Sequence, residues 1–160
     1  MEIYLFFLVI IFCFSFVLLF GAPYVPTMKK QSEVALELLD LRKGQVLYEL
    51  GCGDGRVLLK AKEMGLKSIG YELNPILYLI AKIRTFKARN EIEVRYGNFW
   101  TADLGNADGV YVFLFNKFMK KLDKKLSNEL KKGAKLASYA FKIPDKKIIA
   151  ENQAVFLYKY

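Results

Sequence analysis

Val46-Leu-Tyr-Glu-Leu-Gly-Cys-Gly-Asp-Gly55 is the stretch that decides the fold of this 160-residue chain. Its first five residues are mostly apolar and predict a short buried β-strand. The glycines at positions 51, 53 and 55 then predict a tight turn. Residues 56–64 have the apolar spacing of a helix, and Gly65 ends it. A strand, a glycine-rich turn and a helix in this order are typical of the first unit of a nucleotide-binding α/β fold.

The spacing of the glycines indicates which ligand the turn suits. A dinucleotide-binding fingerprint needs glycine at position 56, and that position is Arg56. Glu49 lies two residues before the first glycine, and the resulting Glu-x-Gly-x-Gly-x-Gly pattern resembles motif I of class I S-adenosylmethionine-dependent methyltransferases. S-adenosylmethionine has no phosphate but carries a sulfonium and an ammonium. Acidic groups therefore favour its binding, while glycines let the backbone approach it closely.

A second carboxylate follows at the end of a second predicted strand, over residues 67–72. Glu72 ends this strand, 23 positions after Glu49. Nucleotide-binding α/β units place an acid that binds the ribose hydroxyls about 20 residues after the glycine motif. A solvated carboxylate at a strand end is the alternative for Glu72. Its combination with the glycine turn favours the ribose.

The next segments predict another helix and strand. Asn74 is suited to cap a helix with Pro75 as its first residue. This helix runs to about residue 88, with four apolar residues expected to face inward: Ile76, Leu77, Ile80 and Ile83. A strand over 92–96 then leads to Asn98, which can bond an adenine edge. Phe99 or Trp100 can flank the adenine ring, although core aromatics in a turn are the alternative.

The second half of the chain completes an alternating α/β pattern. Strands are predicted over 109–115, 134–141, 148–151 and 154–160, with a helix over 117–132. From 117 to 147 there are eleven lysines and three acidic residues. A solvated helix face or attraction to an anionic membrane leaflet explains this excess; nucleic-acid binding ranks third, because no recognised module accompanies the charge. Seven strands ending in a hairpin form the Rossmann-like sheet of class I methyltransferases.

Composition excludes several kinds of chemistry. The chain has a formal net charge of +9 and no histidine, which excludes Ser-His and Cys-His catalysis and makes a metal site unexpected. Its two cysteines, Cys13 in an apolar run and Cys52 in the glycine turn, do not suggest a disulfide.

The N-terminal segment predicts a membrane anchor. No charged residue occurs from 3 to 28, and residues 3–20 are almost entirely apolar, so residues 1–22 are long enough to cross a bilayer. A cleaved signal peptide fits poorly because only Glu2 precedes the apolar run. Lys29 and Lys30 follow it, which predicts a single-pass protein of the cell (inner) membrane with a cytoplasmic C-terminal domain.

Three regions follow from this division. Residues 1–22 are the predicted anchor, and residues 23–43 a linker with an amphipathic helix over 29–41. Residues 44–160 form the predicted methyltransferase domain. The Pro23-Tyr-Val-Pro-Thr27 stretch is a rigid extended spacer, or an arm over the cofactor pocket.

Three motifs behind one apolar segment resemble a more specific family: Pro23-Tyr-Val-Pro-Thr27, Leu50-Gly-Cys-Gly-Asp-Gly-Arg56 and Gly70-Tyr-Glu-Leu-Asn-Pro75. The chain is similar to the membrane-anchored protein lysine methyltransferases of the adenine nucleotide translocase and the ATP synthase c subunit. The resemblance implies methyl transfer from S-adenosylmethionine to a lysine ε-amine.

The resemblance also implies site residues. Those expected to bind the methionine end are Glu49, Gly51, Gly53 and Asp54, with Glu72 on the ribose and Asn98 near the adenine. The remaining cofactor contacts are expected from Cys52, Gly55, Leu73 and Phe99. Expected on the acceptor side are Tyr24, Asn116 and Phe141, and the sequence shows no general base. The Asn116-Lys-Phe118 stretch departs from the motif that methylates planar amines.

Three hypotheses about function remain open at this stage. The first is a membrane-tethered enzyme that methylates a lysine of a membrane-associated protein. The second is a methyltransferase of a membrane lipid or small amphiphile. The third is a non-catalytic membrane scaffold that keeps the fold.

Overall fold

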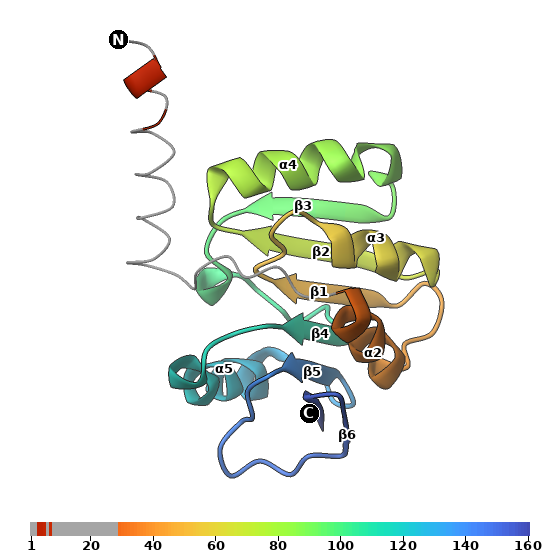
Figure 1. Cartoon of the computed structure of the whole chain (residues 1–160). Coiled ribbons are helices and arrows are strands. Elements are labelled where there is room, and N and C mark those ends of the chain that lie inside the picture. The colour runs from red at the N-terminus through yellow and green to blue at the C-terminus, as the bar shows by residue number, and fades with distance from the viewer. Residues whose placement is uncertain (1–2, 6, 8–28) are drawn as a thin grey trace.

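The structure of the chain is a computed structural model that describes residues 3–5, 7 and 29–160. Seven strands form one sheet in the order β3-β2-β1-β4-β5-β7-β6 (Figure 1). The strands are β1 (Val46–Leu50), β2 (Lys67–Glu72), β3 (Ile92–Tyr96), β4 (Gly109–Val112), β5 (Lys135–Tyr139), β6 (Ala150–Asn152) and β7 (Val155–Lys159). The predicted seven-stranded Rossmann-like sheet is therefore confirmed.

The first five strands run parallel, and only the closing hairpin reverses. β1 pairs with β2 and β4, and β2 and β4 pair outward with β3 and β5. β7 lies antiparallel between β5 and β6. Gln153 and Ala154 both have positive φ in the two-residue turn that joins β6 to β7. Such turns match the twist of the flanking strands.

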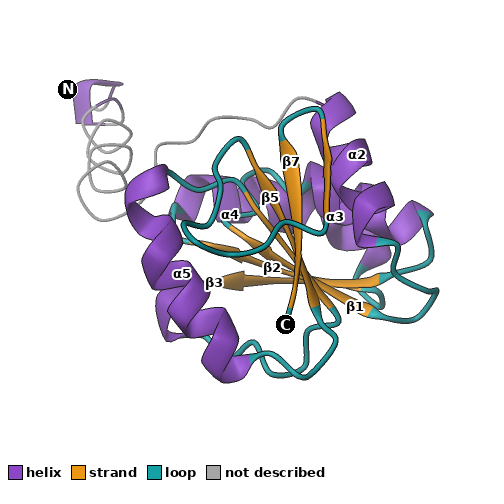
Figure 2. Ribbon diagram, turned by 90° about the horizontal axis from the view of Figure 1, so that it is seen from below, coloured by secondary structure: helices purple, strands orange, loops and turns teal. Residues whose placement is uncertain are grey.

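Helices cover both faces of the sheet. The helical segments are α2 (Lys29–Leu39), α3 (Arg56–Glu63), α4 (Pro75–Thr85), α5 (Asn116–Glu129) and two 3-10 turns, η1 (Phe86–Ala88) and η2 (Phe99–Thr101). Figure 2 shows α5 on the opposite side of the sheet from α2 and α3. Because parallel strands need crossover connections, the central strands are covered on both faces.

Alternation along the strands divides the core into two layers. Tyr48 of β1 and Tyr71 of β2 pack in the layer beneath α5, with their rings 6.3 Å apart. Leu47 packs in the opposite layer with residues of α2 and α3. Because successive side chains point to opposite faces, Glu49 and Glu72 lie on the same face as Leu47.

The helix after β2 differs from the sequence prediction. Leu77, Ala81 and Thr85 form the buried face of α4. Ile80 and Ile83 were expected to face inward, but their side chains are 40% and 78% exposed. The prediction was wrong because α4 is apolar around most of its circumference, so that spacing alone does not identify the packed face.

Some predicted boundaries also differ. The strand predicted over 109–115 ends at Val112, and the helix predicted over 29–41 ends at Leu39. The predicted anchor over 1–22 lies outside the described residues except for 3–5 and 7, and the spacer over 23–27 lies wholly outside them. No helix among the described residues is both long enough and apolar enough to span a membrane.

Candidate cofactor-binding site

The carboxyl ends of β1 and β2 bring the two predicted acids to one place. Glu49 lies opposite Gly70 in the parallel register, and Leu50 lies opposite Tyr71. Glu72 therefore follows directly at the level where β1 enters its glycine turn. Glu49 and Glu72 are only 5% and 7% exposed. Ligands of open α/β sheets bind outside the carboxyl ends of the strands, which is where these carboxylates lie.

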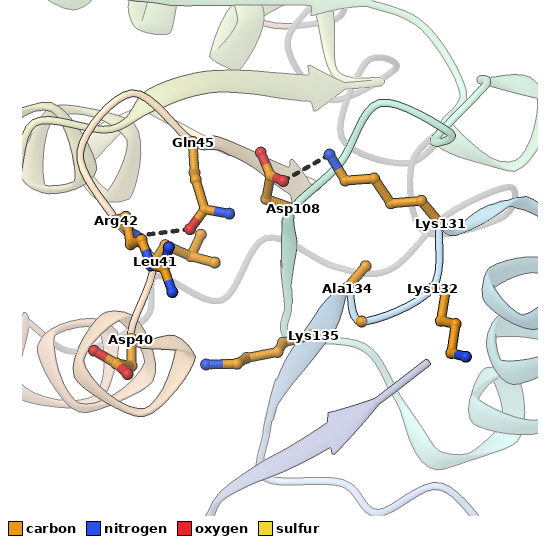
Figure 3. Close-up of a pocket in the computed structure, with 10 residues that line it drawn as sticks. Asp40, Leu41, Arg42, Gln45, Asp108, Lys131, Lys132, Ala134 and Lys135 are labelled. Atoms are coloured by element: carbon orange, nitrogen blue, oxygen red, sulfur yellow. Dashed lines mark hydrogen bonds and ion pairs between the residues drawn. The ribbon is translucent and has the colours of Figure 1, made fainter.

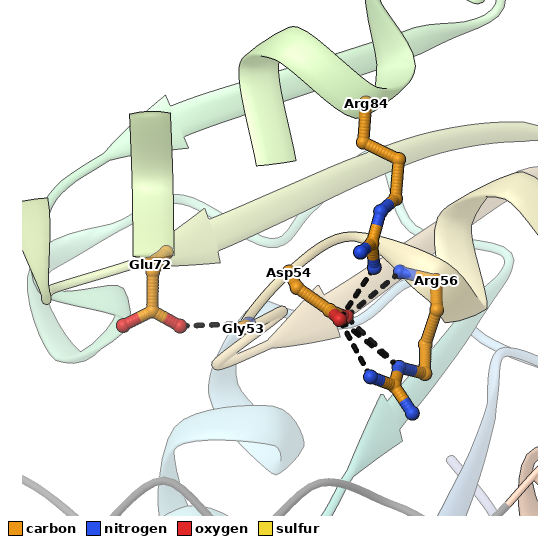
Figure 4. Close-up of polar contacts among 5 residues, drawn as sticks. All are labelled: Gly53, Asp54, Arg56, Glu72 and Arg84. Atoms are coloured by element: carbon orange, nitrogen blue, oxygen red, sulfur yellow. Dashed lines mark hydrogen bonds and ion pairs between the residues drawn. The ribbon is translucent and has the colours of Figure 1, made fainter. Parts of the chain in front are cut away.

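Glu72 holds two backbone segments with its carboxylate. Its Oε2 accepts a hydrogen bond from the Gly53 backbone N–H at 2.7 Å, shown in Figure 4. Its Oε1 accepts from the Asn74 N–H at 2.8 Å. Each carboxylate oxygen can accept more than one hydrogen bond, so Glu72 retains capacity for two ligand hydroxyls. This geometry suits the ribose diol that the sequence predicts.

Glu49 is buried with unused hydrogen-bonding capacity. Among the described residues its Oε2 is a buried atom without a hydrogen-bond partner. Burial and the neighbouring carboxylates of Glu72 and Asp54 raise the pKa of Glu49 well above its ordinary value. Burial also raises the pKa of Glu72, against the lowering effect of its backbone hydrogen bonds. A cationic ligand would supply what the buried Glu49 carboxylate lacks.

The glycine turn is shaped by backbone contacts. The N–H groups of Gly51 and Cys52 both donate to the Tyr71 carbonyl at 2.9 Å. Gly51, Gly53 and Gly55 all have positive φ, a conformation that glycine adopts without steric cost. Burial raises the pKa of the Cys52 thiol, which therefore has little thiolate character.

Gly70 is also required, although it lies on the neighbouring strand. A Cβ added at Gly70 would lie 2.6 Å from the Leu58 side chain and 2.7 Å from the Cys52 sulfur. The turn and α3 therefore pack directly against the bare backbone of β2. This contact explains why the motif before Glu72 begins with glycine.

Asp54 has partners that the sequence prediction did not include. Its carboxylate forms ion pairs with Arg56, at 2.6 Å, and with Arg84 of α4 (Figure 4). Burial alone would raise the pKa of Asp54, but the hydrogen bonds from the two guanidinium groups outweigh it and lower the pKa to about 2. Asp54 was predicted at the methionine end of the cofactor. In the structure its charge is compensated and it links the turn to α4.

Asn74 belongs to the site and was predicted only as a helix cap. Its Oδ1 accepts from the N–H groups of Ile76 and Leu77, as the sequence indicates. The side chain is fully buried, and its Nδ2 has no hydrogen-bond partner among the described residues. The signal in the sequence was its position two residues after Glu72, which places a free amide donor beside the carboxylates.

The predicted adenine side lies at the end of β3. Asn98 is exposed, and its Oδ1 accepts from the Trp100 N–H at 3.1 Å, so part of its capacity is used to cap η2. The Phe99 ring is half-buried and lies 4.7 Å from the Trp100 ring. Leu73 is half-buried between Glu72 and Asn74. These residues lie at the expected edge of the sheet, and their contact with a cofactor stays a prediction.

The predicted acceptor side contains an aromatic cluster, which we define as Phe113, Phe115, Tyr139 and Phe141. The Phe113 ring lies 4.8 Å from Tyr139 and 6.5 Å from Phe141, and Phe115 lies 5.9 Å from Phe141. All four rings are half-buried and follow or end β4 and β5. The sequence indicated only Phe141 among them. Asn116 is exposed at the start of α5, and Tyr24 lies outside the described residues.

A cavity of about 380 Å³ lies at the opposite end of the strands (Figure 3). Its lining includes Gln45 before β1 and Asp108 before β4, and the Lys131 ammonium lies 2.6 Å from the Asp108 carboxylate. Because it opens at the amino ends of the strands, it is separate from Glu49 and Glu72. Within the described part of the chain, no group of three or more His, Cys, Asp or Glu residues could hold a metal ion.

The raised pKa of Glu49 predicts how stability depends on pH. The folded chain keeps this proton at pH values where an ordinary glutamic acid, with a pKa of 4.5, has lost it. The folded state then binds more protons than the unfolded state, so the free energy of unfolding falls as pH rises through the raised pKa. We expect Glu49→Gln to reduce this slope, measured by urea unfolding of the full chain in detergent over a pH series.

A matched control is Glu93→Gln. Glu93 is an exposed acid whose pKa is lowered by hydrogen bonds from Arg95, so its removal leaves the slope above pH 4.5 in place. An equal pH dependence in the parent chain and Glu49→Gln would contradict the assignment of the buried proton to Glu49.

Comparison with known proteins identifies the family. Residues 49–150 match the family model described as the ANTKMT methyltransferase domain. The chain is 34% identical over 148 residues to a protein-lysine N-methyltransferase of Saccharolobus islandicus, an alignment covering 85% of this chain and 92% of the relative. It is 38% identical to the adenine nucleotide translocase lysine N-methyltransferase of Mus musculus, covering 76% of this chain.

The length of the match differs among the relatives. The alignments cover 54% of that mouse protein and 50% of the mouse lysine N-methyltransferase of the ATP synthase c subunit, which is 32% identical, so the chain spans about half their length. A solved RNA methyltransferase from Salinibacter ruber, in complex with S-adenosyl-L-homocysteine, superposes with a TM-score of 0.78 at 29% identity. That match covers 85% of this chain and 92% of the solved chain.

The family model, the relatives and the solved structure agree with the geometry at the ends of β1 and β2. The chain therefore belongs to the ANTKMT family of S-adenosylmethionine-dependent methyltransferases.

Proposed function

We propose that the chain transfers a methyl group from S-adenosylmethionine to the ε-amine of a lysine in a membrane-associated protein. The observation on which the acceptor rests is the match to a protein-lysine N-methyltransferase over 92% of that relative's length. Two further relatives are named for lysines of the adenine nucleotide translocase and of the ATP synthase c subunit. All three names describe a lysine acceptor.

The membrane part of the proposal rests on residues 1–22. This segment contains one charged residue, Glu2, and is long enough to cross a hydrocarbon core. Lys29 and Lys30 follow it, which favours a cytoplasmic catalytic domain at the cell (inner) membrane. A tethered enzyme meets substrates in the same membrane at high effective concentration.

The residues at the carboxyl ends of β1 and β2 fit the charge of the cofactor. Glu49 and the buried Asn74 amide each have an unpartnered polar atom there, and Glu72 accepts from Gly53 and Asn74 while keeping further capacity. We assign Glu49 to the amino end of the cofactor and Glu72 to its ribose. When bound, S-adenosylmethionine supplies a methyl group already activated by the adjacent sulfonium.

The aromatic cluster suits the acceptor. A lysine amine has an ordinary pKa of about 10.4 and must be neutral to act as a nucleophile. Half-buried rings at the ends of β4 and β5 provide an environment that disfavours the charged ammonium. In our proposal the cluster positions and desolvates the amine, and its proton passes to solvent. Positioning is the principal contribution that such a displacement requires.

RNA is a second candidate acceptor. It is favoured by the name of the solved Salinibacter ruber relative and by the net charge of +9. A membrane lipid or small amphiphile is a third candidate, favoured by the apolar N-terminal segment. The three acceptors are separable because each leaves the methyl group in a different chemical fraction.

The first prediction is where the methyl group is found. Cell membranes and RNA from a strain lacking this protein are incubated with the full chain and S-adenosylmethionine labelled in its methyl group. We expect label in a protease-sensitive fraction that yields methyl-lysine on acid hydrolysis. Label in ribonuclease-sensitive material or in the organic extract would replace the lysine acceptor with RNA or with a lipid.

The second prediction concerns Glu72. Glu72→Ala removes the ribose contacts and leaves the Gly53 and Asn74 N–H groups without their acceptor, so we expect S-adenosylhomocysteine binding to weaken by about 1.5–3 kcal/mol in calorimetry. Glu93→Ala, at an exposed acid on β3, is the control and leaves affinity unchanged. Unchanged affinity in Glu72→Ala would remove Glu72 from the site. If the parent chain does not bind, the scaffold hypothesis is favoured.

The third prediction separates the acceptor side from the cofactor side. Phe141→Ala opens the aromatic cluster next to Phe113 and Phe115. We expect a higher KM for the protein acceptor and slower label transfer, with unchanged S-adenosylhomocysteine affinity. Ile149→Ala, at an exposed apolar residue outside the cluster, is the control. Equal transfer by Phe141→Ala and the parent chain would exclude the cluster from acceptor binding.

A further inference from the structure

Helix α4 has apolar side chains on two faces. One face, formed by Leu77, Ala81 and Thr85, is buried against the sheet and α3. Leu79, Ile83 and Phe86 follow the same spacing of three and four residues on the outer side, since residues two apart lie on nearly opposite faces of a helix. Their side chains are 57%, 78% and 63% exposed. A helix that only covers a sheet needs one apolar face.

The exposed apolar residues are concentrated at this edge of the domain. From residue 29 onward, six large apolar side chains are exposed: Leu79, Ile80, Ile83, Phe86, Tyr96 and Ile149. All but Ile149 belong to α4, η1 or the end of β3. The Tyr96 ring lies 5.5 Å from the Tyr78 ring of α4. We call Leu79, Ile80, Ile83, Phe86 and Tyr96 the edge surface, because β3 is the outermost strand (Figure 1).

Basic side chains accompany the edge surface. From 73 to 95 the chain has five basic and two acidic residues. Arg84 is paired with Asp54, and Arg95 with Glu93. Lys82 lies near enough to Glu93 to influence its pKa, and the Arg89 guanidinium lies over the Phe86 ring at 5.1 Å. Lys82, Lys87 and Arg89 are the cations that this stretch can offer to an external anion.

Charge and apolar exposure together identify the kind of partner. We propose that the edge surface docks on an anionic lipid bilayer, with Leu79, Ile83 and Phe86 entering the boundary between headgroups and acyl chains. Lysine and arginine beside such residues reach up to the phosphate groups while their apolar stems stay buried. A second copy fits less well, because a two-fold interface would bring the same cations close to one another.

The lysine-rich helix α5 differs in this respect. Lys125 is paired with Glu129 at 2.6 Å, and Lys121 lies over the Trp100 ring at 4.3 Å. No large apolar side chain of α5 is exposed. Helix α5 can attract an anionic surface, but it has nothing to insert into one. The edge surface has both properties.

Docking through the edge surface would also orient the candidate site. Helix α4 begins directly after Glu72 and Asn74, and Tyr96 ends β3 at the same edge of the sheet. The carboxyl ends of β2 and β3 would therefore lie beside the headgroups. This inference concerns the surface of the domain and holds whichever acceptor is methylated.

Tryptophan fluorescence tests the proposal on the full chain in vesicles. Ile83→Trp is reconstituted into phosphatidylcholine with and without phosphatidylglycerol, and its emission is compared with that of the parent chain, which contains only Trp100. With the anionic lipid we expect a blue shift and quenching by lipids brominated on their acyl chains. Ile149→Trp, at an exposed apolar residue outside the edge surface, is the matched control and stays unquenched.

Charge reversal provides the second arm. In the Ile83→Trp chain, replacing Lys82, Lys87 and Arg89 by glutamate should abolish the quenching, because each lost charge lowers docking by about fivefold. Three results would overturn the proposal: equal quenching at positions 83 and 149, equal quenching with and without phosphatidylglycerol, or a blue shift that needs no lipid and grows with protein concentration. The last would assign the edge surface to a second copy of the chain.

Discussion

The Glu72 carboxylate joins the two halves of the candidate site. One oxygen holds the Gly53 N–H in the turn after β1, and the other holds the Asn74 N–H at the start of α4. A buried carboxylate with two backbone donors has a fixed orientation, since both donors would be unsatisfied if it moved. The position of the turn, the direction of α4 and the remaining acceptor capacity of Glu72 all depend on this bridge. It forms because parallel pairing places the ends of β1 and β2 side by side.

The charges around this bridge are distributed unequally. The Asp54 carboxylate is compensated by Arg56 and Arg84, whereas Glu49 has no cation of its own among the described residues. Uncompensated negative charge therefore lies at the ends of β1 and β2, where the cofactor of this family carries its positive charges. Burial of Glu49 is unfavourable without a ligand, which is typical of groups that are kept for binding rather than for stability.

Local pattern was sufficient for the sheet and for the position of the acids. Glycine spacing, strand-length apolar runs and the Asn74-Pro75 cap each reflect interactions within a few residues, and each is present in the structure. The pairing of Asp54 with Arg84 could not be predicted, because thirty residues separate them and only the packing of α3 against α4 brings them together. The prediction for Ile83 was wrong for a different reason. Helical spacing shows that a side chain is apolar on one face, but not which of two apolar faces the sheet covers.

The acceptor side shows the same limit. Phe141 was named from its position after a predicted strand, but Phe113 and Phe115 were assigned to a continuous strand that ends at Val112 instead. Contacts between rings on separate loops depend on the twist of the sheet and leave no periodic trace in the sequence.

The most direct test of the account is a crystal structure of the full chain with S-adenosylhomocysteine. We expect the Glu72 carboxylate to accept from the ribose hydroxyls while it keeps its bonds to Gly53 and Asn74, and the Glu49 carboxylate to contact the amino group of the ligand. A ligand bound away from the ends of β1 and β2, or bound there with both carboxylates turned from it, would contradict the account.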